Sequence, residues 1–204
     1  MIIIGLTGPS GAGKSTLCEA FEKLGYPCIN TDDIYHQITS VPSPCLNELK
    51  ATFGKSILNE KGGLDRVALA KLVFEGENAN DNLKLLNSIT HKYVWEETNA
   101  ILTKYMKKRK KVAVIDAPAL FSSKVFIGAC NFTLSVLCDK NTRVERIMKR
   151  DNISQEQALA RINAQPSDDF FIKNSDYCIK NCGSREDMVR QLYSILEQEA
   201  IRTK

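Results

Sequence analysis

The stretch from Gly8 to Thr16, GPSGAGKST, constrains the fold of this chain more than any other. It matches the pattern G-x-x-x-x-G-K-[ST] at every fixed position. The apolar, β-branched run Ile2–Thr7 precedes it and predicts a buried strand, and apolar residues at helical spacing follow it from Leu17 to Leu24. The motif therefore lies between a strand and a helix, where a phosphate-binding loop is expected.

This motif predicts the residues that hold a nucleotide. Its glycines let the backbone turn tightly, so that successive N–H groups form a concave nest for phosphate oxygens at the start of a helix. The Lys14 side chain can reach the β- and γ-phosphates, and the Ser15 hydroxyl can ligate Mg²⁺. The alternative, a chance glycine-rich turn, is disfavoured by the full match in the right context. The predicted ATP-binding residues are Gly11, Ala12, Gly13, Lys14, Ser15 and Thr16.

Length and charge are those of a modest α/β protein that acts on small anions. The chain has 204 residues, enough for one such domain with inserts, and its net charge of +4 does not require a nucleic-acid partner. No apolar stretch is long enough to cross a bilayer, and Ile2–Leu6 is too short for a signal sequence, so we predict a cytoplasmic protein without a membrane partner. No feature specifies an oligomeric state.

The seven cysteines are scattered along the chain, and most stand among apolar residues. We therefore expect most of them to be buried thiols. Cys178 and Cys182 are close in sequence but have no nearby histidine or second cysteine pair, so their spacing does not predict a zinc site.

Two carboxylates follow a short predicted strand, Tyr26–Asn30. The carboxyl ends of parallel strands gather at one edge of a sheet, which would put Asp32 and Asp33 at the same edge as the phosphate loop. Either could take a proton from a hydroxyl that attacks ATP. Aspartate is equally favoured at helix starts, so the residues alone do not choose between catalysis and capping.

A third carboxylate, Asp116, ends the predicted buried strand Val112–Ile115. An aspartate at such a strand end resembles the Walker B position, which holds Mg²⁺ directly or through water. The alternative is an ordinary turn residue. Further strands are predicted at Phe132–Leu137 and at Tyr177–Ile179.

Residues 34–111 have mainly helical patterns, with a polar loop expected at Asn78–Asn82 and a helix from Leu83 to Lys108. We interpret this block as a helical insert beside the sheet. A basic run, Lys104–Lys111, closes it. A solvated helix end is the favoured interpretation of that run, ahead of contact with an anion or a nucleic acid, because no aromatic residues are interleaved in the way nucleic-acid binding favours.

Arg143, Arg146 and Arg150 recur at helical spacing and so share one helix face. One or two of them are expected to clamp the transferred phosphoryl group. The alternative is a set of surface arginines paired with neighbouring carboxylates.

Taken together, these residues resemble the dephospho-coenzyme A kinase family of small P-loop kinases, from about Ile3 to Gly183. The resemblance rests on the phosphate loop and on a series of dispersed motifs: Leu24-Gly25, Ile29–Asp32, Phe53-Gly54, Leu64–Arg66, Val73-Phe74, His91, Val114–Pro118, Leu120-Phe121, Arg146, Arg150-Asp151, Arg161–Gln165, Ser175-Asp176, Asn181 and Gly183. The phosphate loop alone is shared by many functions, whereas the combination is much more specific.

The resemblance implies a fold and a reaction. The fold is α/β, a five-stranded parallel sheet flanked by helices in one P-loop kinase domain. Its core would span about 1–33, 112–140 and 176–204, its helical acceptor-binding region about 34–111, and its helical lid about 141–175. The reaction is Mg²⁺-dependent transfer of the γ-phosphoryl group of ATP to the ribose 3′-hydroxyl of dephospho-coenzyme A, the last step of coenzyme A synthesis.

The resemblance also assigns roles that spacing leaves open. It selects Asp32 rather than Asp33 as the base, makes Lys14 and Arg146 catalytic, and adds Arg150 to the ATP site. The metal would be held by Ser15 and Asp116, and the acceptor by Asp32, His36, Arg66 and His91. The chain departs from the family pattern at Asn30, His36, Lys92 and Phe171, on the acceptor and lid sides.

Two other functions are compatible with parts of the sequence. A P-loop kinase for another small metabolite or for a nucleoside monophosphate is the alternative, because the departures fall on the acceptor side. A nucleotide switch without an acceptor substrate is disfavoured, since the guanine-reading N-K-x-D motif is absent.

Overall fold

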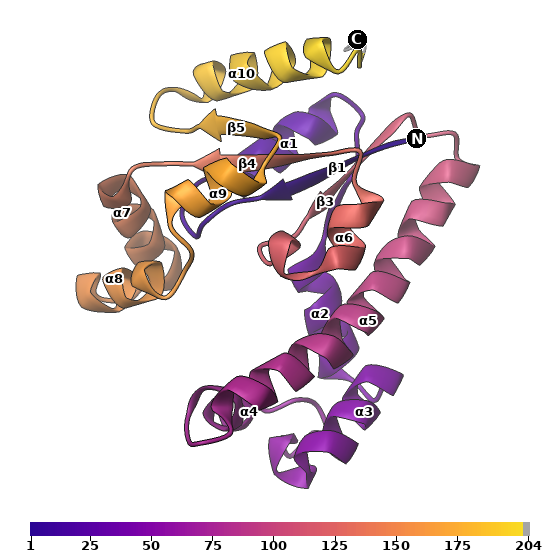
Figure 1. Ribbon diagram of the computed structural model, residues 1–204, viewed down its shortest axis with the longest axis vertical. Coiled ribbons are helices and arrows are strands. Elements are labelled where there is room, and N and C mark those ends of the chain that lie inside the picture. The colour runs from indigo at the N-terminus through magenta and orange to yellow at the C-terminus, as the bar shows by residue number, and fades with distance from the viewer. Residues whose placement is uncertain (202–204) are drawn as a thin grey trace. The chain divides into compact units, whose positions relative to one another are not determined.

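A computed structural model describes residues 1–201 of the chain (Figure 1). The chain divides into two compact units: Met1–Ile29 with the residues from Tyr105 onward, and Asn30–Lys104. The strands are β1 (Ile2–Thr7), β2 (Cys28–Asn30), β3 (Val112–Asp116), β4 (Phe132–Leu137) and β5 (Tyr177–Lys180). They form one sheet in the order β2-β3-β1-β4-β5, and the predicted fold class is confirmed.

The register of the sheet brings strand ends together at one edge. β1 runs parallel to β3 and β4, with Leu6 opposite Asp116 and Thr7 opposite Ser135. β4 runs parallel to β5 in turn. The segments that follow β1, β3, β4 and β5 therefore emerge at the same edge, where ligands of open parallel sheets bind.

Helices cover both faces of the sheet (Figure 1). On one face, α1 (Lys14–Lys23) and α10 (Arg185–Gln198) pack on each other and on β3 and β5. Their apolar faces, including Phe21 and Leu192, are fully buried with the strand side chains. On the other face, η2 (Leu120–Ser122) and α6 (Lys124–Ala129) pack on β1, and α9 (Asp168–Asn174) packs on β4 and β5.

The predicted lid segment forms a helical pair. α7 (Lys140–Asp151) packs against α8 (Gln155–Asn163) through a small core of Val144, Ile147, Ala158 and Ile162. The Asp139 carboxylate caps α7 by accepting from the Thr142 N–H. Ser154 and Gln157 form a capping box at the start of α8.

The second unit is helical. It contains α2 (Thr31–Ser40), α3 (Pro44–Phe53), η1 (Lys55–Ile57), α4 (Arg66–Phe74) and most of α5 (Ala79–Lys107). A separate apolar core includes Leu49 and Ile57, which are fully buried. Asp65 caps α4 by accepting from the N–H groups of Val67 and Ala68, which explains why this helix begins at Arg66.

Two predicted boundaries are wrong. The Asn78–Asn82 segment is not a loop, because α5 begins at Ala79 and the Asn82 N–H donates to the Asn78 carbonyl. Polar residues are tolerated in this first turn because they stay exposed to water. The second strand begins at Cys28 rather than Tyr26, although the Pro27 carbonyl already accepts a hydrogen bond from the Val114 N–H. Proline lacks an N–H group and weakens the ladder there.

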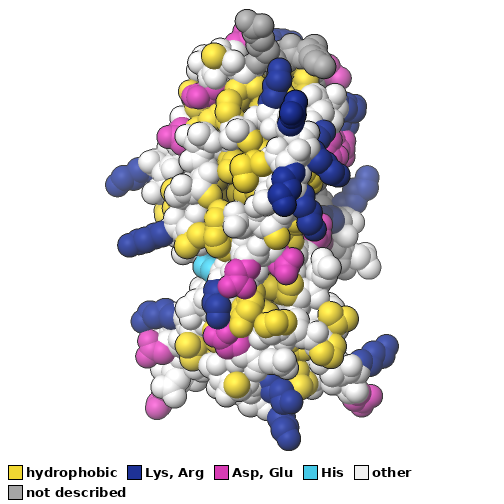
Figure 2. All heavy atoms as spheres, turned by 90° about the vertical axis from the view of Figure 1, so that its right-hand side faces the viewer, with side chains coloured by type: hydrophobic (Ala, Val, Ile, Leu, Met, Phe, Trp, Pro, Cys, Tyr) yellow, Lys and Arg dark blue, Asp and Glu magenta, His cyan; other side chains and the backbone are white. Residues whose placement is uncertain are grey.

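Several surface features also follow from the structure. The side chains of Lys107–Lys111 are exposed, and Figure 2 shows Lys and Arg side chains projecting from the upper part of that view. The expectation that most cysteines are buried is wrong, since Cys45 and Cys138 are buried, Cys182 is exposed and the others are intermediate. Among residues 1–201, no helix is long and apolar enough to cross a membrane.

Candidate active site

The phosphate loop connects β1 to α1 and depends on glycine at two tightly packed positions. Gly8 has φ +139°, and a Cβ there would lie 2.3 Å from the Val136 carbonyl oxygen. Gly13 has φ +104°, and a Cβ there would lie 2.0 Å from the Asn181 side-chain nitrogen. Both the left-handed backbone and the close approach exclude other residues, so the glycines in the motif also fit the loop into its surroundings.

Asn181 holds the loop from the segment that follows β5. Its side-chain nitrogen donates to the Ala12 carbonyl at 2.8 Å, and the residue is buried. Its own N–H donates to the Leu137 carbonyl at 2.7 Å, which ties it to β4. Sequence reasoning assigned Asn181 no role beyond its part in the family pattern, because nothing in the local sequence indicates contact with a loop far earlier in the chain.

A cavity of about 380 Å³ opens beside the loop. Six of the predicted residues line it: Gly11, Gly13, Ser15, Thr16, Arg146 and Arg150. Asn181, Gly183 and Arg185 line it as well and were not predicted to belong to the site. The three arginines give the cavity a cationic wall, which suits the phosphates of a nucleotide. Arg185 is held by an ion pair with Glu19 at 2.6 Å.

Two of the three arginines on the α7 face reach this cavity. Arg146 donates from one terminal nitrogen to the Gly11 carbonyl at 3.2 Å and lies 3.6 Å from the Cys138 sulfur. Arg150 donates to the Ser10 hydroxyl at 3.2 Å and to the Asp151 carboxylate at 2.8 Å. The pKa of Asp151 is lowered to about 2, mainly by its hydrogen bonds with Arg150. Both guanidinium groups therefore lie against the phosphate loop.

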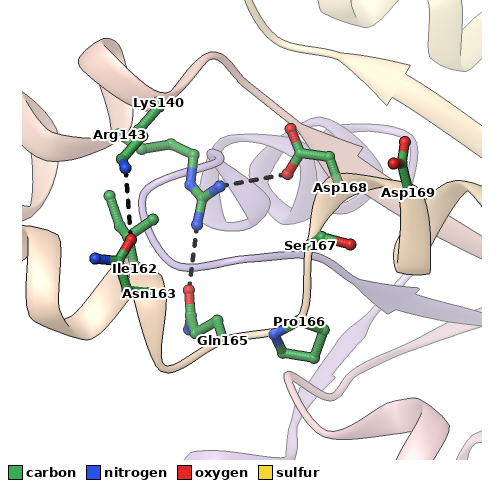
Figure 3. Close-up of a pocket in the computed structure, with 9 residues that line it drawn as sticks. All are labelled: Lys140, Arg143, Ile162, Asn163, Gln165, Pro166, Ser167, Asp168 and Asp169. Carbon is green, nitrogen blue, oxygen red and sulfur yellow. Dashed lines mark hydrogen bonds and ion pairs between the residues drawn. The ribbon is translucent and has the colours of Figure 1, made fainter.

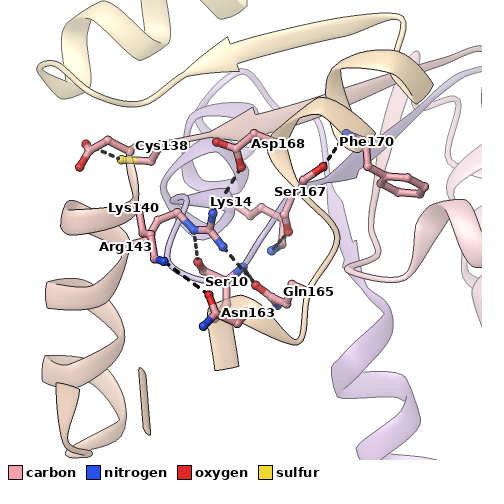
Figure 4. Close-up of polar contacts among 12 residues, drawn as sticks. Ser10, Lys14, Cys138, Lys140, Arg143, Asn163, Gln165, Ser167, Asp168 and Phe170 are labelled. Carbon is pink, nitrogen blue, oxygen red and sulfur yellow. Dashed lines mark hydrogen bonds and ion pairs between the residues drawn. The ribbon is translucent and has the colours of Figure 1, made fainter. Parts of the chain in front are cut away.

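The third arginine, Arg143, is buried and serves a different purpose. It is 5% exposed, and its Nε donates to the Ser10 carbonyl at 3.0 Å. Its terminal nitrogens bind the Gln165 side chain and the Asp168 carboxylate, each at 3.3 Å. Figures 3 and 4 show this guanidinium between Gln165 and Asp168, in a second cavity of about 380 Å³. Gln165 in turn accepts from the Ser10 N–H, so the network joins the phosphate loop to the helical lid segment.

Replacing Arg143 with methionine is expected to destabilise the first unit by about 1–3 kcal/mol, because the half-buried Ser10 carbonyl loses a charged donor. Burial lowers the pKa of Arg143, and the nearby Asp168 carboxylate acts in the opposite direction. Urea denaturation would measure the change. Arg150→Met is the matched control, since that side chain is 58% exposed and its loss should alter stability little. An equal decrease in the free energy of unfolding in both variants would contradict the stabilising role proposed for the buried Arg143 side chain.

Lys14 and Asp116 lie at the same sheet edge. The Lys14 ammonium donates to the Gly8 carbonyl at 2.8 Å, so its side chain folds back over the loop that it serves. Asp116 ends β3 opposite Leu6 and is buried, and the Cys18 thiol donates to its carboxylate at 3.7 Å. A hydroxyl on Ser15 and a carboxylate on Asp116 are hard oxygen donors, the chemistry that Mg²⁺ prefers.

The predicted base lies at the start of α2 in the second unit. Asn30 is the N-cap of this helix and accepts from the N–H groups of Asp32 and Asp33 through its side-chain oxygen. Capping is thus the task of Asn30, one of the positions that departs from the family pattern. Asp32 and Asp33 are both exposed in the first turn, where the helix dipole favours negative charge.

The other predicted acceptor residues belong to the second unit too. His36 is exposed on α2 and contacts the Tyr35 ring, with centroids 5.9 Å apart. Arg66 is exposed at the start of α4, and its positive charge acts on the Tyr35 hydroxyl to lower a pKa that burial raises. His91 is half-buried on α5. Beside it, Lys92 pairs with Glu48 at 3.3 Å.

The stability of the chain should fall on the acid side of neutrality because of His91. Burial lowers the pKa of His91 in the folded chain below the unfolded value of about 6.5, so the unfolded chain binds the proton more readily. The contribution of this residue to stability is complete above that unfolded value and is lost as the pH falls from it through the lower pKa of the folded chain. Urea denaturation from neutral to acidic pH should show a smaller loss in His91→Gln. The exposed residue His36 provides the control, since His36→Gln should keep the wild-type loss.

Comparisons with known proteins match nearly the whole chain to one family. A family model described as dephospho-CoA kinase matches residues 2–187. A Bacillus cereus protein named dephospho-CoA kinase is 37% identical over 197 residues, which cover 97% of this chain and 96% of that protein. A solved structure from Thermus thermophilus has a TM-score of 0.77 at 32% identity and 97% coverage of both chains. A Campylobacter jejuni dephospho-CoA kinase structure has a TM-score of 0.66 at 26% identity and covers 97% of this chain and 96% of its own.

Proposed function

The chain belongs to the dephospho-CoA kinase family, and on that premise we propose that it transfers the γ-phosphoryl group of ATP to the ribose 3′-hydroxyl of dephospho-CoA. As a family member it is an ATP-dependent phosphotransferase. The observation that supports the reaction best is the phosphate loop between β1 and α1, with Arg146 and Arg150 on the wall of the same cavity. A cytoplasmic location stays a prediction.

We propose that positive charge along this cavity stabilises the transferring group. In phosphoryl transfer the catalyst mainly positions the reactants and offsets charge on the equatorial oxygens. Lys14 would act on the β- and γ-phosphates, and Arg146 on the group in transit. Arg150 would hold the nucleotide from the side of Ser10. The backbone N–H groups of the loop, at the N-terminus of α1, would also stabilise the negative charge of the phosphates.

We propose that Ser15 and Asp116 hold Mg²⁺, since both offer oxygen donors beside the phosphate loop. The ion, when bound, would offset charge on the β- and γ-phosphates. Burial of the Asp116 carboxylate keeps it at a fixed place at the end of β3. The Cys18 thiol that donates to it would help to orient it.

We propose that Asp32 accepts the proton of the ribose 3′-hydroxyl and that His36, Arg66 and His91 bind the acceptor. These assignments rest on the family pattern and on the exposure of Asp32 at the start of α2. Proton removal by a carboxylate requires that it lie within hydrogen-bond reach of the hydroxyl in the ternary complex. The Asn30 side chain caps α2 by accepting from the N–H groups of Asp32 and Asp33.

A phosphotransfer assay with a panel of acceptors tests the function. The purified chain would receive ATP, Mg²⁺ and one acceptor at a time: dephospho-CoA, its 3′-deoxy analogue, AMP or CMP. Dephospho-CoA should have the highest kcat/KM, with CoA identified by mass, and the 3′-deoxy analogue should not react. A preference for AMP or CMP would instead favour a nucleoside monophosphate kinase.

A further inference from the structure

Two thiols and a carboxylate meet beside the nucleotide cavity, although one of the thiols is far from the other two groups in sequence. Cys138 and Asp139 follow β4, and Cys182 lies in the turn after β5. β4 and β5 are parallel neighbours, so these segments leave the sheet at the same edge. One ligand atom from each residue lies within 4.8 Å of the other two. From this juxtaposition we propose that Cys138, Asp139 and Cys182 form a binding site for a thiophilic divalent cation of the Zn²⁺ class.

The ligand types suit such an ion. Thiolates select soft or borderline cations, and a Zn²⁺ ion is commonly held by three protein ligands with water in the fourth position. The Cys138 sulfur lies 3.6 Å from one Asp139 oxygen, and all three ligand atoms lie within 4.8 Å of one another. Cys182 lies in an exposed turn and can adjust its position, whereas the Cys138 sulfur is fixed in the interior.

A neighbouring group already orients one of the ligands, Asp139. One oxygen of the Asp139 carboxylate accepts from the Thr142 N–H at 2.9 Å, and the other lies 3.6 Å from the Cys138 sulfur. The carboxylate is thus held by one oxygen and presents the other to the cluster. Partners of this kind fix ligand geometry in metal sites and strengthen binding.

The local charge also balances. Two thiolates and a carboxylate carry three negative charges, a divalent cation reduces these to one, and the Arg146 guanidinium 3.6 Å from the Cys138 sulfur offsets the last. Binding would release the two thiol protons, one of which Cys138 now donates to the Asn181 carbonyl at 2.9 Å. Affinity should therefore rise with pH.

The sequence did not indicate this site. Cys178 and Cys182 are the pair that spacing draws attention to, yet Cys178 lies in β5 and is not part of the cluster. The partner of Cys182 comes instead from the end of the neighbouring strand. The inference stands independently of the proposed function, because it uses only the ligand set and its surroundings.

Titration of the full chain with Co²⁺ tests the site. The protein would carry no affinity tag and would be fully reduced, with its thiols counted by a thiol reagent beforehand. We expect one equivalent of Co²⁺ to bind and to produce a near-ultraviolet thiolate charge-transfer band, which one equivalent of Zn²⁺ then removes. The midpoint of binding should shift to lower metal concentration as the pH rises.

Matched variants locate the ligands. Cys182→Ser removes an exposed thiol without disturbing the core and should weaken binding at least about 10-fold. Asp139→Asn keeps an N-cap side chain for α7 and should also weaken binding, which separates ligation from capping. Cys178→Ser is the control and should bind as the wild type does. Absence of the band in reduced wild-type protein, wild-type affinity in Cys182→Ser, or equal loss in Cys178→Ser would each overturn the proposal.

Discussion

Replacing Asp32 with asparagine is expected to lower kcat with dephospho-CoA by a factor of about 10²–10⁴, the usual contribution of general-base catalysis. The amide is nearly the same size as the carboxylate but cannot take the proton of the 3′-hydroxyl. KM for both substrates should change less than kcat, because the base contributes most in the transition state. Steady-state kinetics with ATP and dephospho-CoA would measure the split.

Asp33→Asn is the matched control for this experiment. Both aspartates are exposed in the first turn of α2, and in both variants the Asn30 cap is retained because it binds backbone N–H groups. Each variant loses a similar favourable interaction with the helix dipole, about 0.3–1 kcal/mol. A difference in kcat between them therefore reports on chemistry rather than on helix stability. Near-wild-type turnover in Asp32→Asn would remove Asp32 from the role of base.

Replacing Lys14 with methionine is expected to lower kcat with any acceptor by a factor of about 10²–10³ or more, the range for loss of one preorganised donor at an oxyanion. Methionine keeps most of the apolar stem and removes the charge that we propose acts on the β- and γ-phosphates. Because the proposal assigns Lys14 to the nucleotide and not to the acceptor, the loss should be similar across every acceptor that reacts. ATP binding, measured by calorimetry, should weaken as well.

Lys23→Met supplies the control for the lysine. Lys23 is an exposed lysine in the last turn of α1, the helix that Lys14 begins, so its loss changes net charge equally. Activity in this variant should stay close to that of the wild type. A Lys14→Met enzyme with unchanged kcat and ATP affinity would contradict the assignment of Gly8–Thr16 as the phosphate-binding loop.

Local patterns predicted most of the elements. β4 has the predicted boundaries, because an apolar run with β-branched residues is a signal contained within a few residues. The capping boxes at Ser154 and Ser184 are also local, since each depends only on residues that are three positions apart. The start of α5 was missed because the polar segment Asn78–Asn82 has no apolar periodicity to identify it as helix.

Side-chain partners could not be predicted in the same way. Arg143, Arg146 and Arg150 share a face of α7, and their spacing gives them equivalent positions. In the structure Arg143 is enclosed by Gln165 and Asp168, whereas the other two line the cavity. Resemblance to the family assigned Arg146 and Arg150 to the site, but only the packing of α8 and α9 separates them physically from Arg143.

The sequence by itself determined the phosphate loop, since the glycines and the lysine that we assign to phosphate and the hydroxyl that we assign to Mg²⁺ are contiguous between a strand and a helix. Only the tertiary structure decided what surrounds that loop. Asn181 and Arg185 reach it, and Cys138 meets Cys182, because the order β1-β4-β5 puts segments distant in the chain at one sheet edge. The physical reason is the sequence separation of the interacting residues. Local backbone conformation follows from neighbouring residues, whereas burial and hydrogen-bond partners depend on which strands pair.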